Sequence, residues 1–119
     1  MSETREPTVF ERIAAGEIPA RIVAETDRVI AFHDIAPQAP VHVVVTPRAG
    51  DYRDVVELAA GDPALLAELV DVARGVAADL ADGEFRLVFN TGASAGQTVF
   101  HVHAHVLAGG LEEGTLAGG

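Results

Sequence analysis

The sequence predicts an α+β domain in which a five-stranded antiparallel sheet is combined with two main helices. β-Branched and apolar runs recur along the chain, a long amphipathic segment follows Asp62-Pro63, and Gly and Pro residues separate these segments. Because 49% of the 119 residues are hydrophobic, the chain can bury a core within one domain. We therefore expect two layers, with the helices packed on one face of the sheet.

The first half of the chain predicts a short helix followed by three strands. Thr8 can cap a helix in which Phe10 and Ile13 recur at helical spacing, and Gly16 ends that helix. A loop with two prolines, Pro37 and Pro40, interrupts the strand-like runs. We expect strands at residues 18–25, 28–32 and 42–46.

The second half predicts the longest helix and two further strands. Asp62 caps this helix, Pro63 opens it, and Gly83 stops it near residue 82, while Gly75 inside it costs about 1 kcal/mol relative to alanine. The remaining expected elements are a short helix within 51–60, a strand at 84–90, a loop at 91–98 and a strand at 99–107. We expect residues 1–8 and 110–119 to be flexible terminal segments.

Charge and composition exclude several classes of partner. The formal net charge of −10 repels long polyanions, so nucleic acid is not an expected ligand, whereas a pocket of backbone N–H groups can still bind a small anion. The absence of cysteine excludes disulfides and thiolate metal ligands. Apolar runs are too short to cross a bilayer and no export leader is evident, so we expect no membrane partner and a cytoplasmic location.

Three of the five histidines alternate along the last predicted strand, at His101, His103 and His105. Successive side chains of a strand point to opposite faces, so these three imidazoles lie on one side, about 7 Å apart at Cα. The intervening Val102 and Ala104 then face the core. The three imidazoles are close enough to act on one phosphate-sized group or to relay protons.

Three interpretations of this cluster remain open. It can be a solvated polar face, a zinc site in which His42 or Asp34 adds a third ligand, or a site of nucleophilic catalysis at phosphorus. The loop from Asn90 to Thr98 favours the third, because its glycines can aim backbone N–H groups at an anion. The amide of Asn90 and the hydroxyl of Thr98 add donors at its two ends.

The motif His101-Val102-His103-Ala104-His105-Val106-Leu107 resembles the signature of the histidine triad family. Further segments resemble the Hint branch of that family and extend the resemblance from about Val9 to Gly109, which gives a HIT domain over 9–109. These segments are Phe10-Glu11-Arg12-Ile13, Glu17-Ile18-Pro19-Ala20, residues 32–40 and Gly96-Gln97-Thr98-Val99-Phe100.

The resemblance implies a homodimer with a ten-stranded sheet that hydrolyses purine nucleoside phosphoramidates, without a cofactor or metal. His103 would be the nucleophile, and His101 and His42 would complete a network that orients it and relays protons. Asp34 would bind the ribose hydroxyls. Phe10, Ile18, Phe32, His33 and Ile35 would wall the base pocket, Asn90, Thr98 and His105 would hold the phosphate, and Gly96 and Gln97 would also contact the nucleotide.

Other assignments compete with these roles. Phe10, Ile18 and Phe32 would be core residues in any such fold, and Asp34 could merely cap a turn. The chain also departs from the family pattern: Thr98 stands where serine is frequent, residues 48–50 lack a histidine, and residues 111–114 lack a tryptophan. The leaving group therefore stays open. A dinucleoside polyphosphate hydrolase and a noncatalytic purine nucleotide-binding module are the alternative functions.

Overall fold

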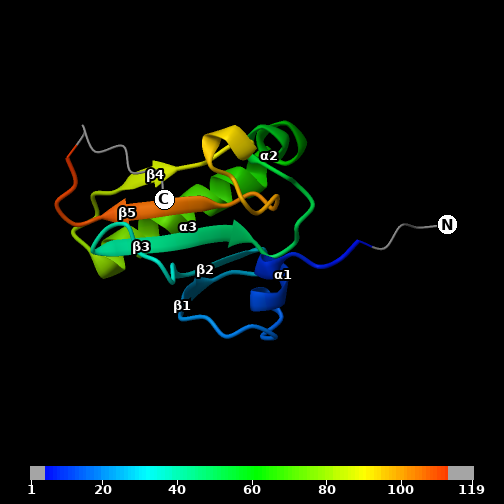
Figure 1. Cartoon of the computed structure of the whole chain (residues 1–119). Helices are drawn as coiled ribbons and strands as arrows, with labels where there is room; N and C mark the ends of the chain where they lie inside the picture. Colours follow the sequence, from blue (N-terminus) through cyan, green and yellow to red (C-terminus); the bar gives the residue numbers. More distant parts are fainter. Residues whose placement is uncertain (1–4, 113–119) are drawn as a thin grey trace.

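The structure is a computed structural model that describes residues 5–112 and has the predicted α+β architecture (Figure 1). Its five strands form one antiparallel sheet in the order β1-β2-β3-β5-β4. The elements are α1 (Val9–Ala14), β1 (Ile22–Glu25), β2 (Val29–His33), β3 (Val41–Pro47), α2 (Val55–Gly61), α3 (Pro63–Leu80), β4 (Arg86–Val88), the 3₁₀ turn η1 (Ala93–Ala95) and β5 (Ala104–Ala108). The predicted fold class is thus confirmed for the single chain.

The main core lies between the sheet and α3, which runs across the back of the sheet in Figure 1. Alternate residues of the central strands point toward the helix, as the period of two requires. Asp62 caps α3 by accepting a hydrogen bond from the Leu65 amide at 3.0 Å, and Pro63 follows it as the first helical residue. Buried members of this core include Val43, Val45, Leu69, Ala73, Val76, Val102, Ala104 and Val106.

The expectation that all helices share one face of the sheet is wrong for α1. Its only buried residue, Phe10, packs in a second, smaller cluster with Phe32 and Val44. These two strand residues are neighbours of Ala31 and Val45, which belong to the main core, so strand alternation turns them to the opposite face. The helix α1 therefore covers the face that carries the histidines.

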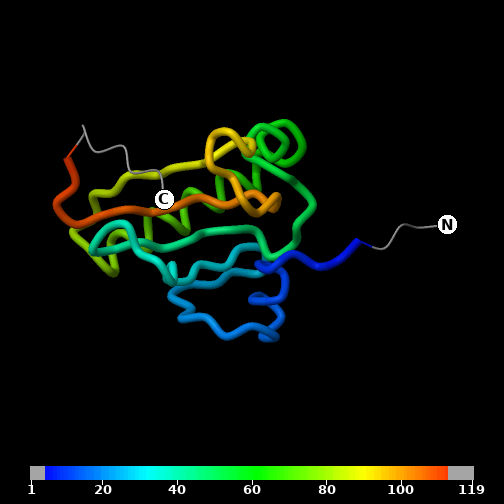
Figure 2. The backbone as a smooth tube through the Cα atoms, in the orientation of Figure 1, coloured from blue at the N-terminus to red at the C-terminus, as the bar shows by residue number. Residues whose placement is uncertain are grey.

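The fifth predicted strand begins later than expected, at Ala104 and not at residue 99. Ahead of it, the Val102 amide donates a hydrogen bond to the Tyr52 carbonyl at 2.9 Å, so this backbone amide bonds to the chain after β3 and not to a strand. Figure 2 shows the two segments side by side. His101 and His103 consequently lie in the extended lead-in to β5, and only His105 lies in the strand.

Other predicted bounds shorten as well. The first strand begins at Ile22, after Pro19, and the fourth covers only Arg86–Val88. Within residues 5–112, no helix is both long and apolar enough to cross a membrane. Of the two terminal segments predicted to be flexible, residues 1–4 and 113–119 lie outside the described part of the chain.

Candidate active site

His101 is completely buried, and both of its ring nitrogens have protein partners. Nε2 lies 2.7 Å from the Pro47 carbonyl oxygen, which can only accept, so Nε2 carries a proton. Nδ1 lies 2.6 Å from Thr8 Oγ1, and in the neutral ring this nitrogen accepts the hydroxyl proton. The surroundings therefore hold one tautomer of His101.

His103 has its tautomer fixed by the backbone of His101. Its Nδ1 lies 2.8 Å from the His101 carbonyl oxygen and must donate, which leaves the Nε2 lone pair free in the neutral ring. The Phe10 ring packs edge-on against it with centroids 4.8 Å apart, and the residue keeps 9% exposure. A nucleophilic imidazole needs this arrangement: one nitrogen held by an acceptor, the other with its lone pair.

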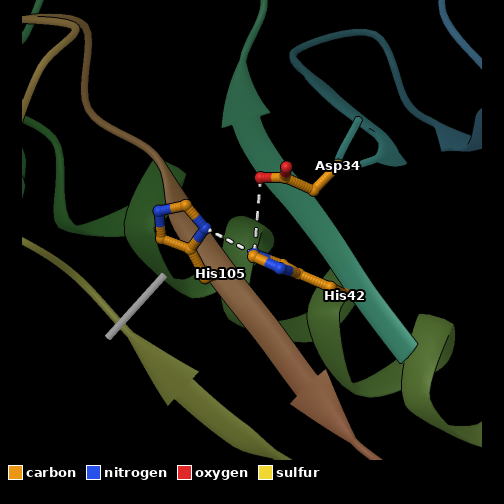
Figure 3. Close-up of side chains that lie close together, drawn as sticks. All are labelled: Asp34, His42 and His105. Carbon is orange, nitrogen blue, oxygen red and sulfur yellow. Dashed lines mark hydrogen bonds and ion pairs between the residues drawn. The ribbon is translucent and has the colours of Figure 1, made fainter. Parts of the chain in front are cut away.

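A second chain of hydrogen bonds joins His42 of β3 to His105 of β5 (Figure 3). The backbone amide of Gln38 donates to His42 Nδ1 at 2.9 Å, so the neutral His42 ring carries its proton on Nε2. That Nε2 lies 2.9 Å from His105 Nδ1, which accepts, and 3.4 Å from an oxygen of Asp34. His105 then carries its proton on Nε2, the nitrogen that points away from His42 in Figure 3.

Burial keeps all four of these histidines neutral. It lowers the pKa of His42, His101 and His103 below the ordinary 6.5, although Asp34 opposes the shift at His42 and His103. Burial, together with the neighbouring His103 and His42, lowers the pKa of His105 to about 4. The site therefore presents one free imidazole lone pair, on His103, and one N–H donor, on His105, near neutral pH.

Asp34, His42 and His105 are also the group, within residues 5–112, whose ligand atoms lie close enough together to suggest a metal, within 4.8 Å of one another. The hydrogen-bond pattern disfavours this use. Metal binding needs a free lone pair on His42 Nε2, but the Gln38 amide already occupies Nδ1, so the ring would have to become an imidazolate. The three residues fit a proton-ordered chain better than a zinc site.

The other predicted site residues divide into buried and accessible ones. Phe10 and Phe32 are buried together, with ring centroids 5.7 Å apart, which agrees with the core interpretation. Ile35, beside Asp34, is 99% exposed and free to contact a ligand. His33, Ile18 and Asn90 are half-buried, and Thr98 and Gly96 are exposed on the loop after η1.

Gln97 lies in that loop but its side chain turns inward. Its amide nitrogen donates to the carbonyls of Arg53 and Val99, and its oxygen accepts from the Gly92 amide. The side chain thus braces the loop that was predicted to supply donors, and its own polar atoms bond to protein groups. A direct nucleotide contact through this side chain gains no support.

Several residues around the histidines were not singled out from the sequence. Thr8 was identified as a helix cap only, and its bond to His101 spans 93 positions, which no local pattern reports. The carbonyl of Pro47 and the amide of Gln38 are backbone groups that carry no sequence signal. The pair Thr8 and Glu11 does fit the capping-box pattern, a signal that could have drawn attention to Glu11.

Fold and site together define a two-layer α+β domain with a buried, tautomer-ordered histidine cluster at its central strands. The chain belongs to the HIT family, because residues 15–110 match the family model described as the HIT domain.

Similar proteins agree with this assignment. An uncharacterized HIT-like protein of Synechocystis is 50% identical over 108 residues, covering 87% of this chain and 91% of that protein. Adenylylsulfatase HINT1 of Arabidopsis thaliana is 39% identical, over 87% of this chain and 71% of that protein. A solved HIT family hydrolase from Clostridium thermocellum superposes with a TM-score of 0.84 at 41% identity, covering 96% and 99% of the two chains.

Proposed function

We propose that this protein is a nucleotide hydrolase that cleaves the P–N bond of purine nucleoside phosphoramidates through a nucleotidyl intermediate on His103. The observation that carries the proposal is the bond from His103 Nδ1 to the His101 carbonyl, which reserves the Nε2 lone pair for attack. Membership of a family that includes hydrolases supports the reaction class.

The reaction runs in two displacements. His103 Nε2 attacks the α-phosphorus, the N–P bond forms, and the amine leaves with a proton from a neighbouring donor; Thr98 is the exposed hydroxyl in the adjacent loop. Water then attacks the same phosphorus, the bond between His103 Nε2 and phosphorus breaks, and the nucleoside monophosphate leaves. The proton lost by the water returns to the group that protonated the amine, so that the site is regenerated. The His105 Nε2–H stabilises charge on a phosphate oxygen, a contribution of about 3 kcal/mol for a well-placed donor.

The nucleotide would lie beside Asp34 and Ile35, at the end of β2. Asp34 keeps one oxygen on the Ala36 amide at 2.8 Å while its side chain remains partly accessible, which leaves acceptor capacity for ribose hydroxyls. The exposed Ile35 side chain offers an apolar surface for the base.

The alternatives differ in the leaving group and in whether chemistry occurs at all. A dinucleoside polyphosphate hydrolase would use the same His103 with a nucleotide leaving group, and the name of the Arabidopsis relative adds adenylyl sulfate to the substrates worth assaying. A noncatalytic nucleotide-binding module would form no covalent adduct. A zinc-dependent hydrolase would stop when a strong chelator is added.

The test compares wild type with His103→Ala on an adenosine phosphoramidate, diadenosine polyphosphates and adenylyl sulfate. We expect the phosphoramidate to be the best wild-type substrate, with turnover lost in His103→Ala while AMP binding, measured calorimetrically, is retained. Mass spectrometry of rapidly quenched wild-type enzyme should detect the nucleotidyl-histidine on the peptide containing His103. Retained phosphoramidase activity in His103→Ala would refute the assignment.

A further inference from the structure

The N-terminus of α1 is joined directly to the histidine cluster through one hydroxyl group. Thr8 Oγ1 accepts a hydrogen bond from the Glu11 amide at 3.0 Å, which caps α1, and lies 2.6 Å from His101 Nδ1. The proton of the same hydroxyl is thus directed at His101. Helix cap and histidine contact depend on one atom.

Glu11 holds this hydroxyl in place relative to the loop that follows β3. Its carboxylate accepts from the Thr8 amide at 2.9 Å, from the Gly50 amide at 2.8 Å, and from both terminal nitrogens of Arg5 at 2.7 and 2.8 Å. The Arg5 guanidinium holds the pKa of Glu11 far below its ordinary value, so the carboxylate stays charged. The start of α1 is thereby fixed to the end of β3, whose Pro47 carbonyl accepts from the other nitrogen of His101.

Gly50 permits the close approach on which this arrangement depends. A Cβ atom at this position would lie 3.2 Å from His101 Nδ1 and 3.2 Å from the Thr8 methyl carbon. A larger residue would require Thr8 or His101 to shift by a few tenths of an ångström.

The placement of the His101 ring influences His103 through a single peptide group. The carbonyl of His101 accepts from His103 Nδ1, and the N–H of the same peptide, on Val102, donates to the Tyr52 carbonyl. This peptide is anchored by Tyr52 on one side, and by the His101 ring, held between Thr8 and Pro47, on the other. Rotation of the His101 ring would disturb the carbonyl that fixes the tautomer of His103.

We propose that Thr8, backed by Glu11 and Arg5, is a positioning residue for the nucleophile, because it locks the His101 ring whose carbonyl orients His103. The proposal rests on the proposed function for its kinetic consequence, while its structural claim concerns the imidazole tautomers alone. Thr8 acts by donating its hydroxyl proton to His101 Nδ1. A helix cap without a hydroxyl group, such as a carboxylate, cannot supply this proton.

Three substitutions at one position separate this role from helix capping. Thr8→Ser keeps the cap and the proton, and Thr8→Val removes both. Thr8→Asp keeps an excellent cap but presents only an acceptor to His101 Nδ1, which then has to take up a proton. The other charged or titratable groups that influence the protonation of His101 are Glu11, Arg5 and His103. Asp54→Ala, which removes the cap of α2 without contacting the histidines, is the matched control.

The first measurement is the ¹⁵N NMR spectrum of the imidazoles, which reports the tautomer of each ring without any substrate. We expect wild type and Thr8→Ser to show His101 protonated on Nε2 and His103 on Nδ1. In Thr8→Val, His103 should populate both tautomers, and in Thr8→Asp, His101 should become protonated on both nitrogens near neutral pH. Unchanged spectra in Thr8→Val and Thr8→Asp would overturn the proposal.

The second measurement is steady-state turnover of the phosphoramidate. We expect kcat to fall about tenfold or more in Thr8→Val and Thr8→Asp, since small misplacement of a reacting group costs up to about a hundredfold, with KM changed less than about twofold. Thr8→Ser and Asp54→Ala should retain the wild-type kcat. If Thr8→Val does not fold, the result for Thr8→Asp decides. If the wild type has no turnover, the proposed function is refuted, and the NMR result alone decides the role of Thr8.

Discussion

At the scale of single residues, the cluster is organised by backbone groups more than by side chains. The carbonyls of Pro47 and His101 and the amide of Gln38 each dictate where one imidazole proton sits. Backbone groups of this kind cannot change their role as donor or acceptor, unlike a hydroxyl or another histidine. The site thus leaves the Nε2 lone pair of His103 free before any substrate arrives.

Keeping four imidazoles buried and neutral has a consequence for stability at acidic pH. Their pKa values are lower in the folded protein than the ordinary 6.5, so below that pH the unfolded chain binds more protons than the folded one. The contribution of these histidines to the free energy of unfolding is therefore fully present above pH 6.5. It is lost as the pH falls toward their folded-state pKa values. For His105, whose folded-state pKa is about 4, the loss amounts to on the order of 3 kcal/mol.

We expect the urea midpoint of unfolding to decrease steadily from pH 7 to pH 5, as the four buried histidines oppose protonation in the folded protein. His105→Asn removes one of the titrating groups, so its midpoint should vary less with pH over the same range. Equilibrium unfolding monitored by circular dichroism at several pH values measures both curves. A wild-type midpoint that stays constant over this range would contradict the interpretation.

At the scale of elements, α3 carries one residue that weakens it. Gly75 lies within this helix, and a Cβ added there would meet no atom within 4 Å in the single chain. The glycine is therefore not required by packing inside the described domain. The conformational entropy of this glycine in the unfolded chain opposes folding, and no contact within the described domain offsets that cost.

Gly75→Ala should raise the free energy of unfolding by about 1 kcal/mol, the difference in helix propensity between the two residues. The reverse change at an exposed position of the same helix, Ala67→Gly, should lower it by a similar amount and serves as the control. Urea unfolding of both variants at low protein concentration measures the effects. Destabilisation by Gly75→Ala would indicate that this face of α3 is covered by another chain.

At the scale of the whole molecule, the two edges of the sheet differ. The edge strand β1 has a register irregularity between Ile22 and Ala24 and ends in the charged Glu25, features that oppose pairing with another strand. The edge strand β4 pairs regularly with β5 and has half-buried apolar neighbours in Phe85 and Phe89. If the ten-stranded dimer implied by the family resemblance forms, β4 is the edge suited to it.

We expect sedimentation equilibrium to give twice the mass of the chain. Val88→Lys, a charge placed on β4, should shift the protein toward the monomer, because it disturbs the proposed edge. Ile22→Lys places the same charge on β1 and should leave the dimer intact. A wild-type protein that sediments as a monomer, or a dimer indifferent to Val88→Lys, would contradict pairing through β4.

The elements could be predicted from local patterns where those patterns are strong. Thr8, and Asp62 with Pro63, mark helix starts that the structure confirms, and the valine-rich run predicted at 42–46 lies in the central strand β3. The predicted strand over 99–107 was too long, because an extended segment can satisfy its amides outside a sheet, as Val102 does with Tyr52. Periodicity reports which side chains share a face and says little about hydrogen-bond partners.

By itself, the sequence determined the α+β class, the alternation that separates His101, His103 and His105 from the core residues between them, and the family to which the motif belongs. Only the tertiary structure decided which nitrogen of each imidazole carries a proton, because the partners come from α1, from the end of β3 and from the loop before it. The physical reason is that side-chain direction is set by neighbouring residues, whereas a hydrogen bond depends on atoms brought together by the whole fold.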